Sequence, residues 1–136
     1  MHLEAEVVTE PAKVDARAVY DFASQMNNLP RWASGLASGI AQRGGRWVTQ
    51  SPMGEVSVAM AAKNEFGVMD HDVTLPDGTS VHNAFRVTPA GDSSVFTFVV
   101  LRMPGTSQEA FEADVAHVRK DLKALRRLLE TSQAPA

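Results

Sequence analysis

The sequence predicts an α+β fold, in which a curved antiparallel β-sheet wraps around a long C-terminal α-helix and two short helices follow the first strand. Between positions 107 and 130, apolar residues recur every three or four positions, the period of an amphipathic helix. This stripe consists of Phe111, Val115, Val118, Leu122, Leu125 and Leu129. Between positions 40 and 101, short strand-like segments alternate with Gly and Pro turn signals, which is typical of an antiparallel meander.

The N-terminal part supplies the first strand and the two short helices. Apolar residues at positions 3, 5 and 7 alternate with acidic ones, which predicts a half-exposed strand that ends at Pro11. Asp15 can cap a helix over residues 15–26. Asn28 can cap a second short helix whose first turn accepts Pro30. The bend between the two helices presents Trp32.

The meander is expected to contain strands over 40–42, 46–51, 55–62 and 95–101, and a hairpin between 66 and 87. The hairpin turn at 76–78, Pro-Asp-Gly, suits a three-residue loop that pairs Leu75 with Thr79. Counting back from this pair places His71 opposite Asn83 on one face of the hairpin. That face also carries Val73, Val81, Met69 and Phe85, so it is apolar apart from the His71–Asn83 pair. The opposite face carries Asp70, Asp72, His82 and Arg86, which are groups that water solvates easily.

Length and composition limit the class of protein. The 136 residues suit one domain, over residues 1–130, followed by a disordered tail over 131–136. The chain has no cysteine, which excludes disulfides, thiolate metal sites and a cysteine nucleophile. A net charge of −3 argues against nucleic-acid binding. The early acids and the lack of a long apolar run predict a cytoplasmic protein without a membrane span.

Neither a metal site nor a cofactor site is expected. Asp70, His71 and Asp72 are consecutive, so strand alternation sends the aspartates to the face opposite the histidine. The other histidines, at positions 2, 82 and 117, are scattered along the chain. Phosphate loops and dinucleotide fingerprints are missing from the sequence. The basic residues between 119 and 127 are interpreted as the solvated face of the last helix.

Several local motifs resemble the SRPBCC superfamily, and more narrowly its bacterial polyketide cyclase/dehydrase-like branch with the START-like helix-grip fold. These motifs are Asn28-Leu-Pro-Arg-Trp32, Gly45-Arg-Trp47, Ser51-Pro-Met-Gly54, Phe66-Gly-Val-Met-Asp-His71 and Asp121-Leu-Lys-Ala-Leu125. The resemblance implies a cavity between the sheet and the last helix. On this sequence the implied cavity wall consists of Trp32, Met60, Met69, His71, Asn83, Phe85, Phe98 and Val118.

Three functional hypotheses follow from these observations. The first is binding of a small, largely apolar, aromatic or polyketide-like ligand in this cavity, with His71 and Asn83 as its polar anchors. The second is a polyketide cyclase or dehydratase that uses His71 as a catalytic acid or base. The third is a protein-interaction module with a filled core, in which an outer face formed by Val95, Thr97 and Val99 is covered by a partner or in a homodimer.

Overall fold

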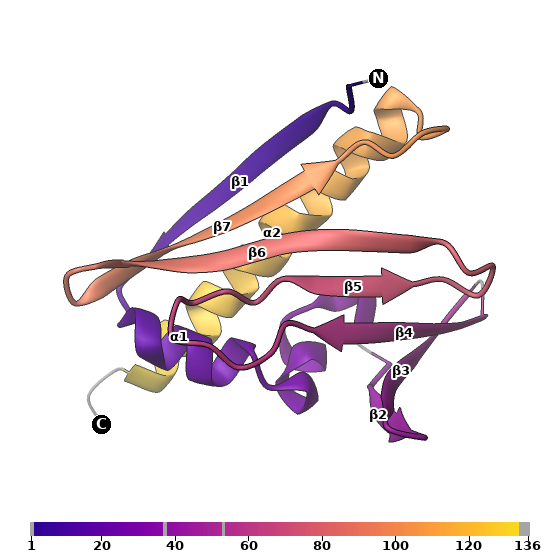
Figure 1. Cartoon of the computed structure of the whole chain (residues 1–136). Coiled ribbons are helices and arrows are strands. Elements are labelled where there is room, and N and C mark those ends of the chain that lie inside the picture. Colours follow the sequence, from indigo (N-terminus) through magenta and orange to yellow (C-terminus); the bar gives the residue numbers. More distant parts are fainter. Residues whose placement is uncertain (1, 37, 53, 134–136) are drawn as a thin grey trace.

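The computed structural model describes residues 2–36, 38–52 and 54–133. These residues form a seven-stranded antiparallel sheet in the order β1-β7-β6-β5-β4-β3-β2, with a long helix, α2, against one face (Figure 1). The strands are β1 (Ala5–Ala12), β2 (Ala41–Arg43), β3 (Arg46–Ser51), β4 (Gly54–Met60), β5 (His71–Thr74), β6 (Ser80–Ala90) and β7 (Ser93–Leu101). The helices are α1 (Ala16–Ala23), the 3-10 helices η1 (Met26–Arg31) and η2 (Ser34–Leu36), and α2 (Gln108–Gln133). The α+β prediction is therefore confirmed.

The hairpin has the register that its turn predicts. His71 pairs with Asn83 and Val73 with Val81, while the Leu75 amide donates to the Thr79 carbonyl over 2.8 Å. Gly78 has a φ of 91°, the left-handed conformation that a G1 bulge requires. Upstream of β5, the Met69 amide donates to the Phe85 carbonyl in the same register. The turn therefore determines which side chains face α2 from this part of the sheet.

The first strand differs from the prediction in both its end and its orientation. It continues through Pro11, which is tolerated because β1 is an edge strand paired only with β7. Its inward residues are Val8, Glu10 and Ala12, whereas Val7 is 56% exposed. The buried Glu10 carboxylate binds Lys123 and Arg126 of α2, over 3.3 and 2.5 Å. These ion pairs let an acidic residue take an inward position.

The short helices confirm one predicted cap and correct another. Asp15 caps α1 by accepting from the amides of Arg17 and Ala18, although this helix ends at Ala23 instead of residue 26. Asn28 lies inside η1 and donates from its side chain to the Phe22 carbonyl, so it joins η1 to α1 instead of capping η1. Trp32 follows η1 and is buried, as expected for a residue at this bend.

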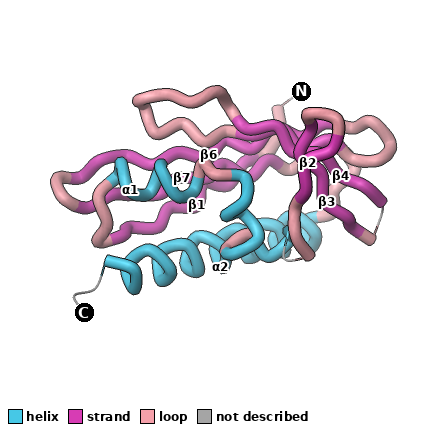
Figure 2. The backbone as a smooth tube through the Cα atoms, turned by 90° about the horizontal axis from the view of Figure 1, so that it is seen from below, coloured by secondary structure: helices cyan, strands magenta, loops and turns pink. Residues whose placement is uncertain are grey.

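The last helix lies along one face of the sheet as a separate layer (Figure 2). The Ser107 hydroxyl accepts from the Ala110 amide over 3.1 Å, which confirms its role as a cap. Of the apolar stripe, Phe111, Leu122, Leu125 and Leu129 are buried in the core. The helix continues to Gln133, so residues 131–133 of the predicted tail are helical, while 134–136 lie outside the described residues. No helix within the described ranges is long and apolar enough to cross a membrane.

Candidate functional site

A hollow of about 350 Å³ lies between α2 and the sheet, beneath η1 and η2. Seventeen of the described residues line it, from η1, η2, α2, strands β3 to β7 and the loops next to them, and most are apolar. The polar side chains among them include His71, Asn83, His117 and Asp121. Two other hollows, of about 380 and 440 Å³, flank α1. We call the hollow between α2 and the sheet the central hollow.

Five of the eight cavity residues expected from the sequence line the central hollow: Trp32, His71, Asn83, Phe98 and Val118. Met69 and Phe85 do not line it, because both are fully buried in the core behind its wall. The Phe85 ring lies 5.5 Å from that of Trp32 and 5.6 Å from that of Phe98, so it supports the two rings from behind. Met60 lines the 440 Å³ hollow beside α1 instead.

In the wall of the central hollow, both ring nitrogens of His71 have an assigned partner. Its Nδ1 lies 3.0 Å from the carbonyl oxygen of Met69, which can only accept, so Nδ1 carries the proton. Nε2 is then an acceptor, and the Asn83 side-chain amide lies 3.3 Å from it. Burial lowers the pKa of His71 below its ordinary value of 6.5, despite the Met69 carbonyl and the nearby aspartates. The imidazole is therefore neutral near pH 7 and presents a basic nitrogen on the sheet side of the hollow.

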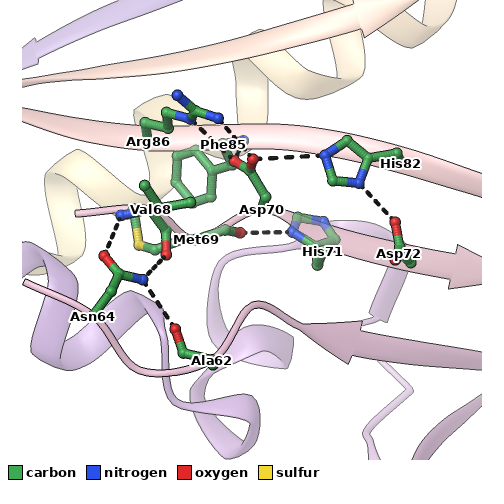
Figure 3. Close-up of polar contacts among 10 residues, drawn as sticks. All are labelled: Ala62, Asn64, Val68, Met69, Asp70, His71, Asp72, His82, Phe85 and Arg86. Atoms are coloured by element: carbon green, nitrogen blue, oxygen red, sulfur yellow. Dashed lines mark hydrogen bonds and ion pairs between the residues drawn. The ribbon is translucent and has the colours of Figure 1, made fainter. Parts of the chain in front are cut away.

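The outer face of the hairpin carries a connected group of charges, the Asp70 network, which consists of Asp70, Asp72, His82 and Arg86 (Figure 3). The Asp70 carboxylate binds Arg86 over 3.0 Å and lies 3.6 Å from His82, which in turn binds Asp72 over 2.7 Å. Asp70 is only 8% exposed, so the expectation that water solvates it is wrong. Burial opposes its charge, but Arg86, the Phe85 amide and His82 outweigh burial and lower the pKa of Asp70.

The Asp70 network touches His71 through the backbone. In a hydrogen-bonded antiparallel pair, Met69 and Phe85 would exchange two N–H···O bonds. Here the Met69 amide donates to Phe85, but the Phe85 amide donates to Asp70 Oδ1 over 2.9 Å. The Met69 carbonyl instead accepts from His71 (Figure 3). An outer-face carboxylate thus takes the amide that would otherwise compete with the imidazole for this carbonyl.

A second polar group, missed in the sequence analysis, joins η2 to α2 at the central hollow. The Ser34 hydroxyl donates to Asp121 Oδ1 over 2.7 Å and lies 3.0 Å from His117 Nε2. His117 Nε2 also lies 3.4 Å from Asp121 Oδ2. The i, i+4 spacing of His117 and Asp121, each directly before a residue of the apolar stripe, is a signal that places both at the edge of the buried face. Nothing in the local sequence points to Ser34.

These three residue types are those of a serine hydrolase triad, but their arrangement differs. In a triad the imidazole bridges the hydroxyl and the carboxylate through two different nitrogens. Here one nitrogen of His117 faces both partners, and Ser34 gives its proton directly to Asp121. The group therefore links two elements and does not activate the Ser34 hydroxyl.

Trp32 contributes an unpaired donor to this region. Its indole Nε1 is buried and has no hydrogen-bond partner among the described residues. A buried N–H without an acceptor costs about 1–3 kcal/mol.

Comparison with known proteins gives matches only at the level of structure. No protein-family model matches the sequence, and no curated protein does. A START superfamily protein from Mycobacterium smegmatis is 15% identical, with a TM-score of 0.67 over 93% of this chain and 97% of that one. CalU16 from Micromonospora echinospora is 12% identical, with a TM-score of 0.69 over 98% and 78% of the two chains.

The di-domain ARO/CYC BexL, from the BE-7585A biosynthetic pathway, is 15% identical, with a TM-score of 0.72. The match covers 97% of this chain but 48% of BexL, so this chain spans about half of that protein. At such low identities the matches show the fold alone. They agree with the resemblance carried by the sequence motifs, and the chain has the START-like helix-grip fold.

Proposed function

We propose that this protein binds a compact, largely apolar ligand with an aromatic or polyketide-like skeleton in the central hollow. The observation that carries the proposal is the His71–Asn83 pair, which is set into a largely apolar wall beside Phe98. Ligand pockets typically combine apolar walls with a few placed polar groups and have volumes of about 300–1,000 Å³. The central hollow, at about 350 Å³, fits the lower end of that range.

This proposal is favoured over a protein-interaction module with a filled core. The volume and the largely apolar lining of the central hollow support a ligand in this space. Val95, Thr97 and Val99, the residues on which the interaction hypothesis rests, are each partly buried without a partner chain.

A thermal-shift screen against quinones, flavonoids, sterols, fatty acids and polycyclic aromatics tests the proposal. A ligand at about 100 times its Kd stabilises the folded state by about 2.7 kcal/mol, which is easily detected. We expect a shift with at least one class and a smaller shift for His71→Ala, because this variant removes the acceptor Nε2. His2→Ala, which removes an exposed histidine outside the lining, serves as the matched control. The absence of a shift with every class would contradict ligand binding.

A second candidate function is acid/base catalysis by His71, as in a cyclase or dehydratase. The observation that favours it is the neutral imidazole with its Nδ1 held by Met69, which leaves Nε2 free to take up a proton once Asn83 moves aside. Catalysis would require turnover of a ligand found in the screen. His71→Ala should then abolish turnover while the protein stays folded, and unchanged turnover would exclude His71 as the catalytic base.

A further inference from the structure

We infer that the central hollow selects an uncharged ligand that carries a hydroxyl group, and that it rejects the same skeleton when it carries a carboxylate. This inference rests on the proposed function and adds the chemical class of the ligand. It follows from the charges that line the hollow and from the hydrogen-bonding groups that these residues leave available.

The lining of the central hollow carries a negative charge and no fixed positive charge. Asp121 is its only carboxylate, and neither Lys nor Arg is among the described lining residues. His71 adds no positive charge near pH 7, because its imidazole is buried and neutral. A ligand carboxylate would therefore enter an apolar space next to a like charge, and both effects oppose its binding.

Asp121 is buried without a Lys or Arg to neutralise it. It is 9% exposed, and the contacts that it makes within the described chain are with the Ser34 amide and hydroxyl and with His117. Both Ser34 bonds go to Oδ1, while Oδ2 has only His117 Nε2 at 3.4 Å. Oδ2 therefore retains acceptor capacity for a hydroxyl donor, whereas a ligand oxyanion would lie near a like charge that no Lys or Arg of the described lining offsets.

A neighbouring hollow of about 250 Å³ has the same electrostatic character. It shares Asn83, Phe98, His117 and Val118 with the central hollow and extends along α2. Asp114 is the only carboxylate among its described lining residues, which include neither Lys nor Arg. A longer ligand that reached into this space would not find a cation for a carboxylate there.

The remaining polar groups suit a hydroxyl, which can both donate and accept. The Asn83 side-chain amide has two hydrogens, and its bond to His71 Nε2 uses one of them, so it can also donate. Asp121 Oδ2 and the side-chain oxygen of Asn83 are acceptors in the same lining. A hydroxyl can pair with either kind of group and stays neutral, so it loses less solvation free energy on entering the apolar space than a carboxylate does.

The test measures the Kd of matched alcohol and carboxylate pairs on naphthalene, anthracene and biphenyl skeletons. The probes are 2-naphthol with 2-naphthoate, 2-anthrol with anthracene-2-carboxylate, and 4-phenylphenol with biphenyl-4-carboxylate, at about pH 8, where the carboxylates are charged and the phenolic hydroxyls are neutral. We expect each alcohol that binds to do so at least about tenfold more tightly than its carboxylate. In Asp121→Asn the carboxylate should gain affinity and the ratio should fall, although the apolar lining still disfavours a charged group.

Glu112→Gln is the matched control, because it removes one negative charge from an exposed position on the same helix, outside the lining. It should leave the ratio unchanged. Carboxylates that bind as tightly as the alcohols would overturn the inference while supporting ligand binding. A ratio that persists in Asp121→Asn, or falls equally in Glu112→Gln, would also overturn it. If no compound of any pair binds, the proposed function fails and the inference fails with it.

Discussion

Asp70 is a carboxylate on the outer face of the sheet that behaves as a buried residue. Its Oδ1 accepts from the amide of Phe85, which is almost fully buried, while its charge is balanced by Arg86. The hydrogen bond from the Phe85 amide requires an acceptor at position 70, whereas the ion pair with Arg86 requires a negative charge there. Substitution by Asn or by Ala therefore separates the two contributions.

We expect Asp70→Ala to destabilise the protein by about 1–3 kcal/mol, because the buried Phe85 amide loses its present acceptor and can regain one only by competing with His71 for the Met69 carbonyl. Asp70→Asn keeps an oxygen for that amide and should cost less than about 1 kcal/mol, since the side chain of Arg86 is 57% exposed and its ion pair is screened by water. Urea denaturation of both variants checks this order. Equal losses of stability in the two variants would show that the charge of Asp70 contributes more than its hydrogen bond with the Phe85 amide.

The lowered pKa of Asp70 also sets the sign of a pH effect. A carboxyl with a lower pKa in the folded state stabilises the protein above its unfolded pKa, at about 3.9, and loses this contribution as the pH falls through the folded pKa. The difference in stability between the wild type and Asp70→Asn should therefore shrink in acid.

Two histidines of the hairpin should titrate on opposite sides of the ordinary value. Burial lowers the pKa of His71 below 6.5, whereas the Asp72 hydrogen bond raises the pKa of His82 above it. His71 therefore does not oppose folding above pH 6.5, and it lowers the free energy of unfolding as the pH falls from 6.5 toward the pKa of His71 in the folded state. His82 favours folding below 6.5 and loses this effect as the pH rises through its folded pKa. NMR titration checks both, with His82→Gln to assign the signals.

A His71 signal that titrates at or above pH 6.5 would contradict the neutral, buried imidazole on which the proposed role of His71 depends.

The hairpin register, and with it the His71–Asn83 pair, could be predicted because turn geometry and strand alternation are local properties. The burial of Asp70 could not, because it depends on Arg86 and His82 closing over the carboxylate from the neighbouring strand.

At the scale of elements, the segment before β5 is held close to β6 by a glycine. Gly67 has a φ of 72°, its carbonyl accepts from the Val87 amide over 3.0 Å, and a Cβ at this position would lie 2.4 Å from the Val87 carbonyl oxygen. Gly91 has a φ of 66° but nothing within 4 Å of the corresponding position. The two glycines therefore share a left-handed backbone conformation, but a neighbouring strand lies close only to Gly67.

We expect Gly91→Ala to cost about 1–2 kcal/mol, from the left-handed conformation alone. Gly67→Ala should cost more, because the methyl group meets backbone that cannot move without disturbing the pairing with β6. The denaturation midpoints of the two variants give the comparison. Equal costs would mean that the segment moves away from β6 without penalty.

The orientation of β1 shows where element-level prediction fails. The alternation at positions 3 to 7 correctly indicated a strand, but the inward residues are Val8, Glu10 and Ala12. Glu10 can point inward because two basic residues from α2, more than a hundred positions away, meet its carboxylate. A local pattern of polar and apolar residues cannot include a partner at that distance.

At the scale of the whole molecule, the contact of Ser34 with Asp121 joins the 3-10 helices to α2 beside the central hollow. We expect Ser34→Ala to loosen this connection and to increase the rate at which a bound ligand dissociates. Stopped-flow displacement measures that rate, and hydrogen exchange of residues 33–36 reports the loosening. Ser38→Ala, whose hydroxyl contacts the Gln50 carbonyl at 3.4 Å, is the control. An unchanged dissociation rate would show that ligand exchange does not require movement of η2.

The sequence supports the fold more fully than the site. The period of the last helix and the order of the strands depend on patterns that persist over many residues, and both are present in the structure. The central hollow instead forms where α2, the sheet and the 3-10 helices meet, so its lining depends on long-range packing. For that reason His117 and Asp121 join the lining, whereas Met69 and Phe85 lie behind it.

Backbone groups of the paired residues Met69 and Phe85 bind side chains on both faces of the sheet, which has a consequence for anyone who redesigns this protein. A β-sheet is a single peptide layer, so the backbone groups of one strand serve residues on both sides. Charged residues beside Arg86 would ordinarily be considered safe to change for solubility or crystallisation. Here a change at Asp70 would free the Phe85 amide to compete for the Met69 carbonyl, which orients His71 on the other face. Surface variants of this hairpin should therefore be assayed for ligand affinity as well as for stability.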